Sequence, residues 1–230
     1  MDPENYEKSV EQKMNNGLVE IWNELKSSDK QVIFKEVADG KGLPPAAIEK
    51  DWWVQRTLEL VFATEIGEHT VFKGGTSLSK AWNLIDRFSE DIDLALDRKY
   101  LGFNKPMTGS QVKKLREHAL KFISENFFPL LQKTFKDAGF GDVALQLREP
   151  TSNDQDPLII EVNYPGVTDK SEYLQPRVLI EIGSRSLIEP LLFFIISLFC
   201  LKQINSASRA SIVLPGLRCR TIKTCVYRKF

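Results

Sequence analysis

The residue types that could do chemistry are concentrated around two aspartates, Asp91 and Asp93, which are separated by one residue. Apolar residues alternate with them as far as Leu96, and this period of two is typical of a β-strand. A strand would place both carboxylates on one face, where they repel each other unless a proton or a cation intervenes. Mg²⁺ is a hard cation that takes oxygen ligands and bridges to phosphates. The spacing therefore predicts that Asp91 and Asp93 bind Mg²⁺ and take part in catalysis.

A glycine turn precedes the aspartate pair, between a short β-rich segment and a segment with the pattern of a helix. Gly74 and Gly75 allow close approach of the backbone to a ligand, and the start of a helix offers free amide donors to a phosphate. The residues that we predict to bind a nucleotide are Gly74, Gly75, Thr76, Ser77, Lys80 and Arg87. For Lys80 and Arg87, a solvated helix face is the simpler interpretation. A phosphate cradle that faces a metal site is the layout needed to transfer a nucleotidyl group.

A third carboxylate is expected at Glu181, which stands among apolar β-type residues in the segment VLIEIG. Burying a lone acid there is costly unless a metal, an arginine or a proton compensates its charge. Two interpretations remain open: Glu181 is a third catalytic carboxylate, or it forms a structural salt bridge with Arg177 or Arg185. Glu161, in the segment LIIEVNY, is a similar but weaker candidate.

The elements that must position these residues follow from the hydrophobic periodicity and from the turn residues. Helices are expected over residues 4–26, 28–37, 45–62, 77–84 and 110–138. Strands are expected over residues 70–72, 92–96, 143–148, 158–164 and 177–182. This order favours an α+β fold with a mixed sheet. We expect an N-terminal helical region over 1–64, a catalytic core over 65–190 and a distinct tail over 191–230.

The charge of the chain is unevenly distributed. Residues 1–190 contain 24 Lys and Arg against 31 Asp and Glu, whereas residues 191–230 contain seven basic residues, no acid and all three cysteines. An acidic first part without a basic, aromatic-rich strip disfavours a simple nucleic-acid-binding module. Three cysteines do not suggest a disulfide framework. The longest apolar run, Leu191–Leu201, is short of the about 20 residues that span a membrane, and the polar N-terminus is unlike a signal peptide. A cytoplasmic protein is expected.

Four segments together resemble one bacterial family. These are FKGGTSLSK, RFSEDIDL, IEKDWWV (Ile48–Val54) and PRVLIEIGSRS (Pro176–Ser186). The combination is similar to the AbiEii/AbiGii-type toxins, nucleotidyltransferases of the DNA polymerase β-like superfamily. The resemblance implies a minimal nucleotidyltransferase fold with an N-terminal helical extension, a nucleoside triphosphate donor and Mg²⁺. It also implies a role in type IV toxin–antitoxin and phage abortive-infection systems, an RNA acceptor such as the tRNA 3′ end, and a cognate antitoxin.

Carried over by position, the resemblance implies that Gly75 and Thr76 hold the triphosphate while Asp91 and Asp93 bind the metal. Glu181 would either deprotonate the attacking hydroxyl or complete the metal shell, and both roles remain open.

The tail departs from the family pattern, because no Arg-Thr-Phe-x-Glu-Lys-type motif follows Pro190. Our hypothesis is that the coding frame shifts near Pro190, which would make residues 191–230 non-native. A natural short variant with a basic, apolar C-terminal helix is the alternative. The corresponding functional alternative is a truncated, catalytically inactive family member that still binds nucleotide or a partner.

Overall fold

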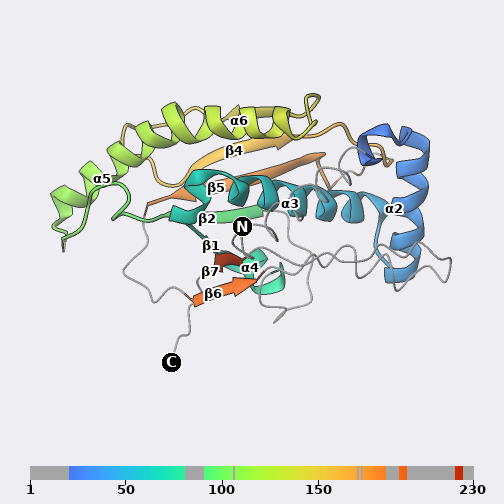
Figure 1. Ribbon diagram of the computed structural model, residues 1–230, viewed down its shortest axis with the longest axis horizontal. Coiled ribbons are helices and arrows are strands. Elements are labelled where there is room, and N and C mark those ends of the chain that lie inside the picture. The colour runs from blue at the N-terminus through green and yellow to red at the C-terminus, as the bar shows by residue number, and fades with distance from the viewer. Residues whose placement is uncertain are drawn as a thin grey trace, which may run out of the picture.

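The computed structural model describes residues 21–80, 91–105, 107–169, 171 and 173–184, together with the backbone of residues 192–195 and 221–224. Helices pack against a seven-stranded sheet (Figure 1). The α-helices are α2 (Ser27–Lys41), α3 (Pro45–Ala63), α4 (Gly74–Lys80), α5 (Gly109–Phe122) and α6 (Phe128–Asp137). The strands are β1 (Thr70–Lys73), β2 (Asp91–Leu96), β3 (Ala144–Leu147), β4 (Leu158–Asn163), β5 (Arg177–Gly183), β6 (Leu192–Ile195) and β7 (Thr221–Thr224). The 3-10 helix η1 (Glu65–His69) precedes β1, and the π-helical segment η2 (Ile123–Phe127) joins α5 to α6.

The sheet is mixed, with strand order β3-β4-β5-β2-β1-β7-β6. Strand β2 is parallel to β5 and antiparallel to β1, while β3, β4 and β5 follow one another in antiparallel order. The predicted α+β class with a mixed sheet is therefore confirmed. The helix expected over 4–26 lies mostly outside the described residues, of which 21–24 are helical, and the helix expected over 77–84 is described only to Lys80. From the acid-free tail, β6 and β7 extend the sheet beyond β1.

Local sequence signals account for several helix ends. Gly42 ends α2 in the left-handed conformation, with a φ of 66°, which glycine adopts at little cost. Pro45 occupies the first turn of α3, where its missing amide hydrogen leaves no hydrogen bond unmade. Thr108 and Gln111 form a capping box at the start of α5.

The two faces of the sheet differ in character because the strand residues alternate. Ile160 and Ile180 are 0% exposed and belong to the main core, which includes residues of α3, α5 and α6. Their neighbours Glu161 and Leu179 are only half-buried and lie on the opposite face. Helices therefore cover one face of the sheet, and the other face, which we call the carboxylate face, carries the predicted catalytic residues.

Candidate active site

The glycine turn lies directly against one of the paired aspartates. Lys73, the last residue of β1, is the antiparallel partner of Asp93 on β2. Helix α4 begins directly after it, at Gly74 and not at Ser77 as predicted, so the glycine turn is the first turn of α4 and begins beside that carboxylate. Gly74 has a φ of +75°, and a Cβ at this position would lie 1.9 Å from Oδ2 of Asp93. Both the backbone conformation and the contact therefore require glycine at position 74.

Asp91 and Asp93 lie on one face of β2, as the alternation predicted. Asp91 is exposed and Asp93 is half-buried. Burial raises the pKa of Asp93, the charge of nearby Asp91 raises it further, and the charge of Lys73 opposes the rise. A raised pKa means that the ionised pair is unfavourable as it stands, and a bound divalent cation would relieve this cost. The donor set of carboxylate oxygens fits a hard cation such as Mg²⁺.

The hydroxyl groups of the turn take part in its own structure. Thr76 is buried, and its Oγ1 donates a hydrogen bond to the backbone carbonyl of Asp91, which ties α4 to β2. Ser77 Oγ donates to the carbonyl of Gly74 at 2.8 Å. These bonds fix the turn beside the aspartates, and each hydroxyl oxygen retains lone pairs that could accept a further bond. That Thr76 and Ser77 contact a nucleotide stays a prediction.

Lys80 forms an ion pair with Asp51 of α3, in which both side chains are largely buried. It is therefore not on a solvated helix face, and a phosphate would have to compete with Asp51 for it. Asp51 lies in the segment IEKDWWV, but its spacing from Lys80 in sequence gave no indication that the two would meet. Arg87 lies outside the described residues.

Glu181 is the residue of β5 that pairs in register with Asp93 on the parallel neighbour β2. The two side chains therefore project from the same face of adjacent strands, about 4.8 Å apart at the backbone. Within the described part of the chain, Glu181 has no hydrogen bond or ion pair. Arg177, one of its two suggested partners, instead binds Glu161, and Arg185, the other, lies outside the described residues.

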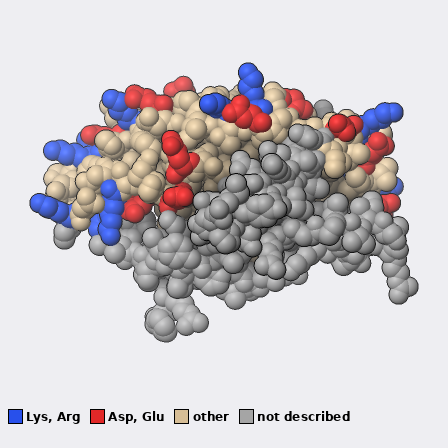
Figure 2. Space-filling view, in the orientation of Figure 1, with Lys and Arg blue, Asp and Glu red and all other residues tan. Residues whose placement is uncertain are grey.

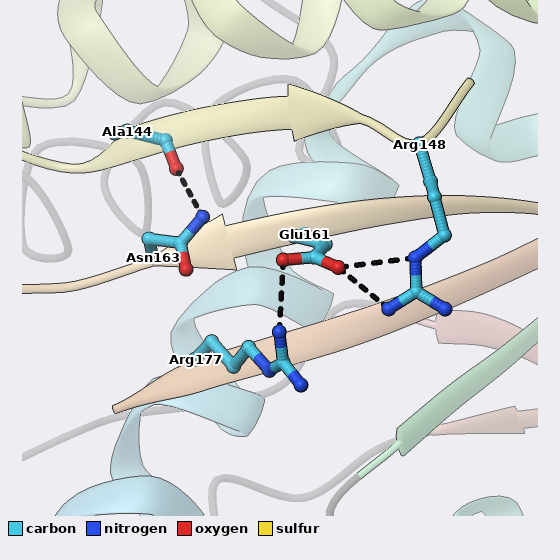
Figure 3. A network of polar contacts seen from close by, with 5 residues as sticks. All are labelled: Ala144, Arg148, Glu161, Asn163 and Arg177. Atoms are coloured by element: carbon cyan, nitrogen blue, oxygen red, sulfur yellow. Dashed lines mark hydrogen bonds and ion pairs between the residues drawn. The ribbon is translucent and has the colours of Figure 1, made fainter. Parts of the chain in front are cut away.

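Glu161 is engaged by two arginines from the neighbouring strands (Figure 3). Arg148 donates to its Oε1 and Arg177 donates to its Oε2. Hydrogen bonds from Arg148 and the positive charges of both arginines lower the pKa of Glu161 against the effect of burial. With both oxygens occupied, Glu161 is a poor candidate for the third catalytic carboxylate.

Among the described residues, no three His, Cys, Asp or Glu side chains are gathered closely enough to form a ready-made metal cluster. Two concavities of the described surface lie elsewhere, one of about 260 Å³ beside Phe135 and one of about 390 Å³ beside Pro45. Within the described part of the chain, shared strand register is what brings the aspartates, the glycine turn and Glu181 together.

A mixed sheet that carries an Asp-x-Asp pair beside a glycine turn is the arrangement of a nucleotidyltransferase. Residues 59–205 match the family described as the nucleotidyl transferase AbiEii toxin of type IV toxin–antitoxin systems. The chain therefore belongs to the AbiEii family. The matched segment contains the glycine turn, both aspartates and Glu181, and it continues past Pro190 into the acid-free tail.

One solved structure that matches the chain is that of MenT4, a nucleotidyltransferase toxin from Mycobacterium tuberculosis. It is 20% identical in sequence, with a TM-score of 0.45. The alignment covers 88% of this chain and 55% of that protein, so the chain spans little more than half of the MenT4 length. No curated protein matches the sequence. Among the described helices, none is long and apolar enough to cross a membrane.

Proposed function

We propose that this protein is an Mg²⁺-dependent nucleotidyltransferase toxin that transfers a nucleotide from a nucleoside triphosphate to an RNA acceptor. The observation that carries the proposal is the contact between the glycine turn and Asp93, because a Cβ at Gly74 would lie 1.9 Å from its carboxylate. This contact places an amide-rich turn, suited to phosphate, against carboxylates suited to a cation. The tRNA 3′ end is the acceptor that we expect, a neighbouring antitoxin is the expected partner, and the cytoplasm is the expected location.

The chain's own residues have distinct parts in this proposal. Asp91 and Asp93 would hold the divalent cation, which when bound neutralises phosphate charge and stabilises the leaving group. Gly75 and Thr76 would position the triphosphate. Glu181, in register with Asp93, supplies a third carboxylate that completes the metal shell or accepts the proton of the attacking hydroxyl.

Incorporation of α-³²P-labelled nucleotide into total RNA and protein, with Mg²⁺ present, tests the proposal. The wild-type chain should label RNA, and an Asp91→Ala/Asp93→Ala variant should lose about 100-fold or more of the rate, as expected when a metal-binding pair is removed. An Asp137→Ala/Asp142→Ala variant is the matched control, since it removes two exposed carboxylates at and just beyond the end of α6. Label on protein alone would contradict the RNA acceptor. No label from folded wild-type chain would favour the inactive family member that the sequence left open.

A further inference from the structure

A row of residues in register crosses the carboxylate face, and all but one of them, Ile159, are charged. Lys73 on β1 pairs with Asp93 on β2, which pairs with Glu181 on β5. Glu181 pairs in turn with Ile159 on β4, and the amide of Arg148, just after β3, donates to the carbonyl of Ile159 at 2.9 Å. Residues in register project from the same face of a sheet. The two carboxylates therefore have a cation on each side, with Lys73 next to the glycine turn and Arg148 near the opposite edge of the sheet.

Arg148 is joined by a second arginine through the carboxylate of Glu161. Arg148 Nη2 lies 2.6 Å from Glu161 Oε1, and Arg177 Nη1 lies 3.1 Å from Oε2. Figure 3 shows that both guanidinium groups lie on the side of the sheet that faces away from α3. We call these three residues the arginine clamp. The Glu161 side chain is only 14% exposed, so its carboxylate has little freedom to move. Because both arginines are bound to it, their flexible side chains are held in one orientation.

The clamp retains a positive charge and free donors. The pKa of Glu161 is lowered, so one negative charge stands against two positive ones at neutral pH. Each guanidinium has five N–H groups. Arg148 donates to Glu161 through Nε and Nη2, and Arg177 donates through Nη1. The side chains of Arg148 and Arg177 are 45% and 38% exposed, so their remaining donors can reach a ligand.

The position of the clamp indicates which ligand it would bind. In the sheet order, Asp93 on β2 and Glu181 on β5 lie between the glycine turn after β1 and Arg148, which directly follows the edge strand β3. Arg177 lies on β5 itself, four residues before Glu181. The donor triphosphate is expected at the turn, so the clamp lies on the acceptor's side. Arg148 stands two strand spacings from Glu181, about 10 Å. Half-buried Ile159 lies between Arg148 and Glu181, and half-buried Leu179 lies between Glu181 and Arg177 along β5. We call these two residues the apolar floor.

In the view of Figure 2, basic and acidic side chains are interspersed over the described surface, without a broad field of one sign. Arginine forks bind phosphate oxygens with geometric specificity, and isolated lysines on helices do so less well.

We propose that Arg148 and Arg177, held in place by Glu161, bind a backbone phosphate of the single-stranded RNA acceptor next to its reacting end. This inference rests on the proposed function, since it assigns the acceptor side of the same site. Glu161 is a positioning residue here, and the two arginines are the binding residues.

The test measures binding of a short single-stranded RNA by fluorescence anisotropy, over a series of salt concentrations and without nucleoside triphosphate. No chemistry can occur under these conditions, so the result is independent of transfer activity. An Arg148→Gln/Arg177→Gln variant should bind RNA at least about 10-fold more weakly. The negative slope of the logarithm of the association constant against the logarithm of the salt concentration should become shallower by about 0.7 for each phosphate that the variant no longer neutralises. Its affinity for a nucleoside triphosphate should be unchanged, because the donor site is elsewhere.

Two further variants complete the design. Lys133→Gln/Lys136→Gln removes two exposed positive charges from α6, behind the sheet, and should keep wild-type affinity and slope. Arg148→Gln/Glu161→Gln/Arg177→Gln leaves no unpaired carboxylate and should fold as the wild type does while binding RNA as weakly as the double variant.

An unchanged salt slope in the double arginine variant would overturn the proposal. So would an equal loss of RNA affinity in the lysine variant, or a loss of triphosphate affinity in place of RNA affinity in the double arginine variant. Absence of RNA binding by the wild type would overturn it too. The two proposals can also fail separately. If the wild type binds RNA, the double variant binds it more weakly and the wild type transfers no label, the proposed enzyme activity is contradicted but the RNA-binding role of the arginine clamp is supported.

Discussion

At the scale of single residues, Gly74 links the backbone of the turn to the chemistry of the site. Its φ of +75° costs an L-residue about 1 kcal/mol, and the Asp93 carboxylate occupies the space that a Cβ would need. We predict that Gly74→Ala lowers the free energy of unfolding by clearly more than this backbone cost. Because Asp93 must move to admit the methyl group, nucleotide transfer should fall by about 10-fold or more. Urea unfolding and the labelling rate measure the two effects.

Substitutions at two other glycines serve as controls, because they separate the cost of the backbone conformation at Gly74 from the cost of the contact with Asp93. Gly102 has a φ of +87°, and an added Cβ would meet no described atom within 4 Å, so Gly102→Ala should cost only the backbone term of about 1 kcal/mol. Gly109 begins α5 in open space, without a positive φ, so Gly109→Ala should be neutral or stabilise slightly. If Gly74→Ala behaved like Gly102→Ala in both measurements, the close contact with Asp93 would have no consequence.

At the scale of elements, helix α3 holds the connection between β4 and β5, the strands that carry Glu161 and Arg177. Glu49 of α3 is 3% exposed and accepts hydrogen bonds from the amides of Val167 at 2.8 Å and Thr168 at 3.1 Å. It also accepts a bond of 2.5 Å from the Thr168 hydroxyl. One buried carboxylate therefore satisfies three donors of the loop.

We predict that Glu49→Ala lowers the free energy of unfolding by about 3 kcal/mol, because it leaves two backbone amides without their charged acceptor. Hydrogen exchange of the Val167 and Thr168 amides should become much faster. Thr168→Val is the matched control: it removes only the hydroxyl donor, so it should cost about 1 kcal/mol and leave both amides protected. Unchanged exchange in Glu49→Ala would mean that the loop is held by other contacts.

The elements that could be predicted from sequence are those whose pattern is local. Burial alternates along the whole of β4 and along β5 as far as Ile182, because one face of these strands packs into the core and the other does not. This periodicity is visible in the residues themselves. The Asp91 and Asp93 pair shares a face for the same reason. The site could be predicted only as far as such local rules reach.

Contacts between distant segments could not be predicted in this way. Lys80 meets Asp51 because α4 packs near α3, and a helix pattern gives no information on which neighbouring helix lies beside it. The sequence suggested Arg177 as a partner of Glu181, four residues away. Strand register instead sets Glu161 of β4 opposite Leu179, within reach of Arg177 and Arg148. Register depends on the assembled sheet, which no short segment specifies alone.

At the scale of the whole molecule, strand β5 has one face in the helix-covered core and one on the carboxylate face, where we propose that the function lies. Adjacent residues of β5 test this division. Ile180 is 0% exposed in the helix-covered core, so Ile180→Ala should lower the free energy of unfolding by about 2–5 kcal/mol. Leu179 is half-buried on the carboxylate face between Asp91 and Glu161. Leu179→Ala should cost only about 1 kcal/mol, since less apolar surface is removed from the core.

In transfer activity, the order of the two variants should be reversed: Leu179→Ala, the more stable variant, should lose more activity than Ile180→Ala. Leu179→Ala removes part of the apolar floor between the carboxylates and the arginine clamp, so transfer to RNA should fall several-fold in a chain that is still folded. Ile180→Ala, measured well below its unfolding temperature, should retain the wild-type rate, because its side chain belongs to the buried core on the face opposite the carboxylates. Urea unfolding and single-turnover labelling provide the two readouts. Equal destabilisation by both substitutions would mean that the carboxylate face is packed like a second core, and the acceptor could not then lie across it.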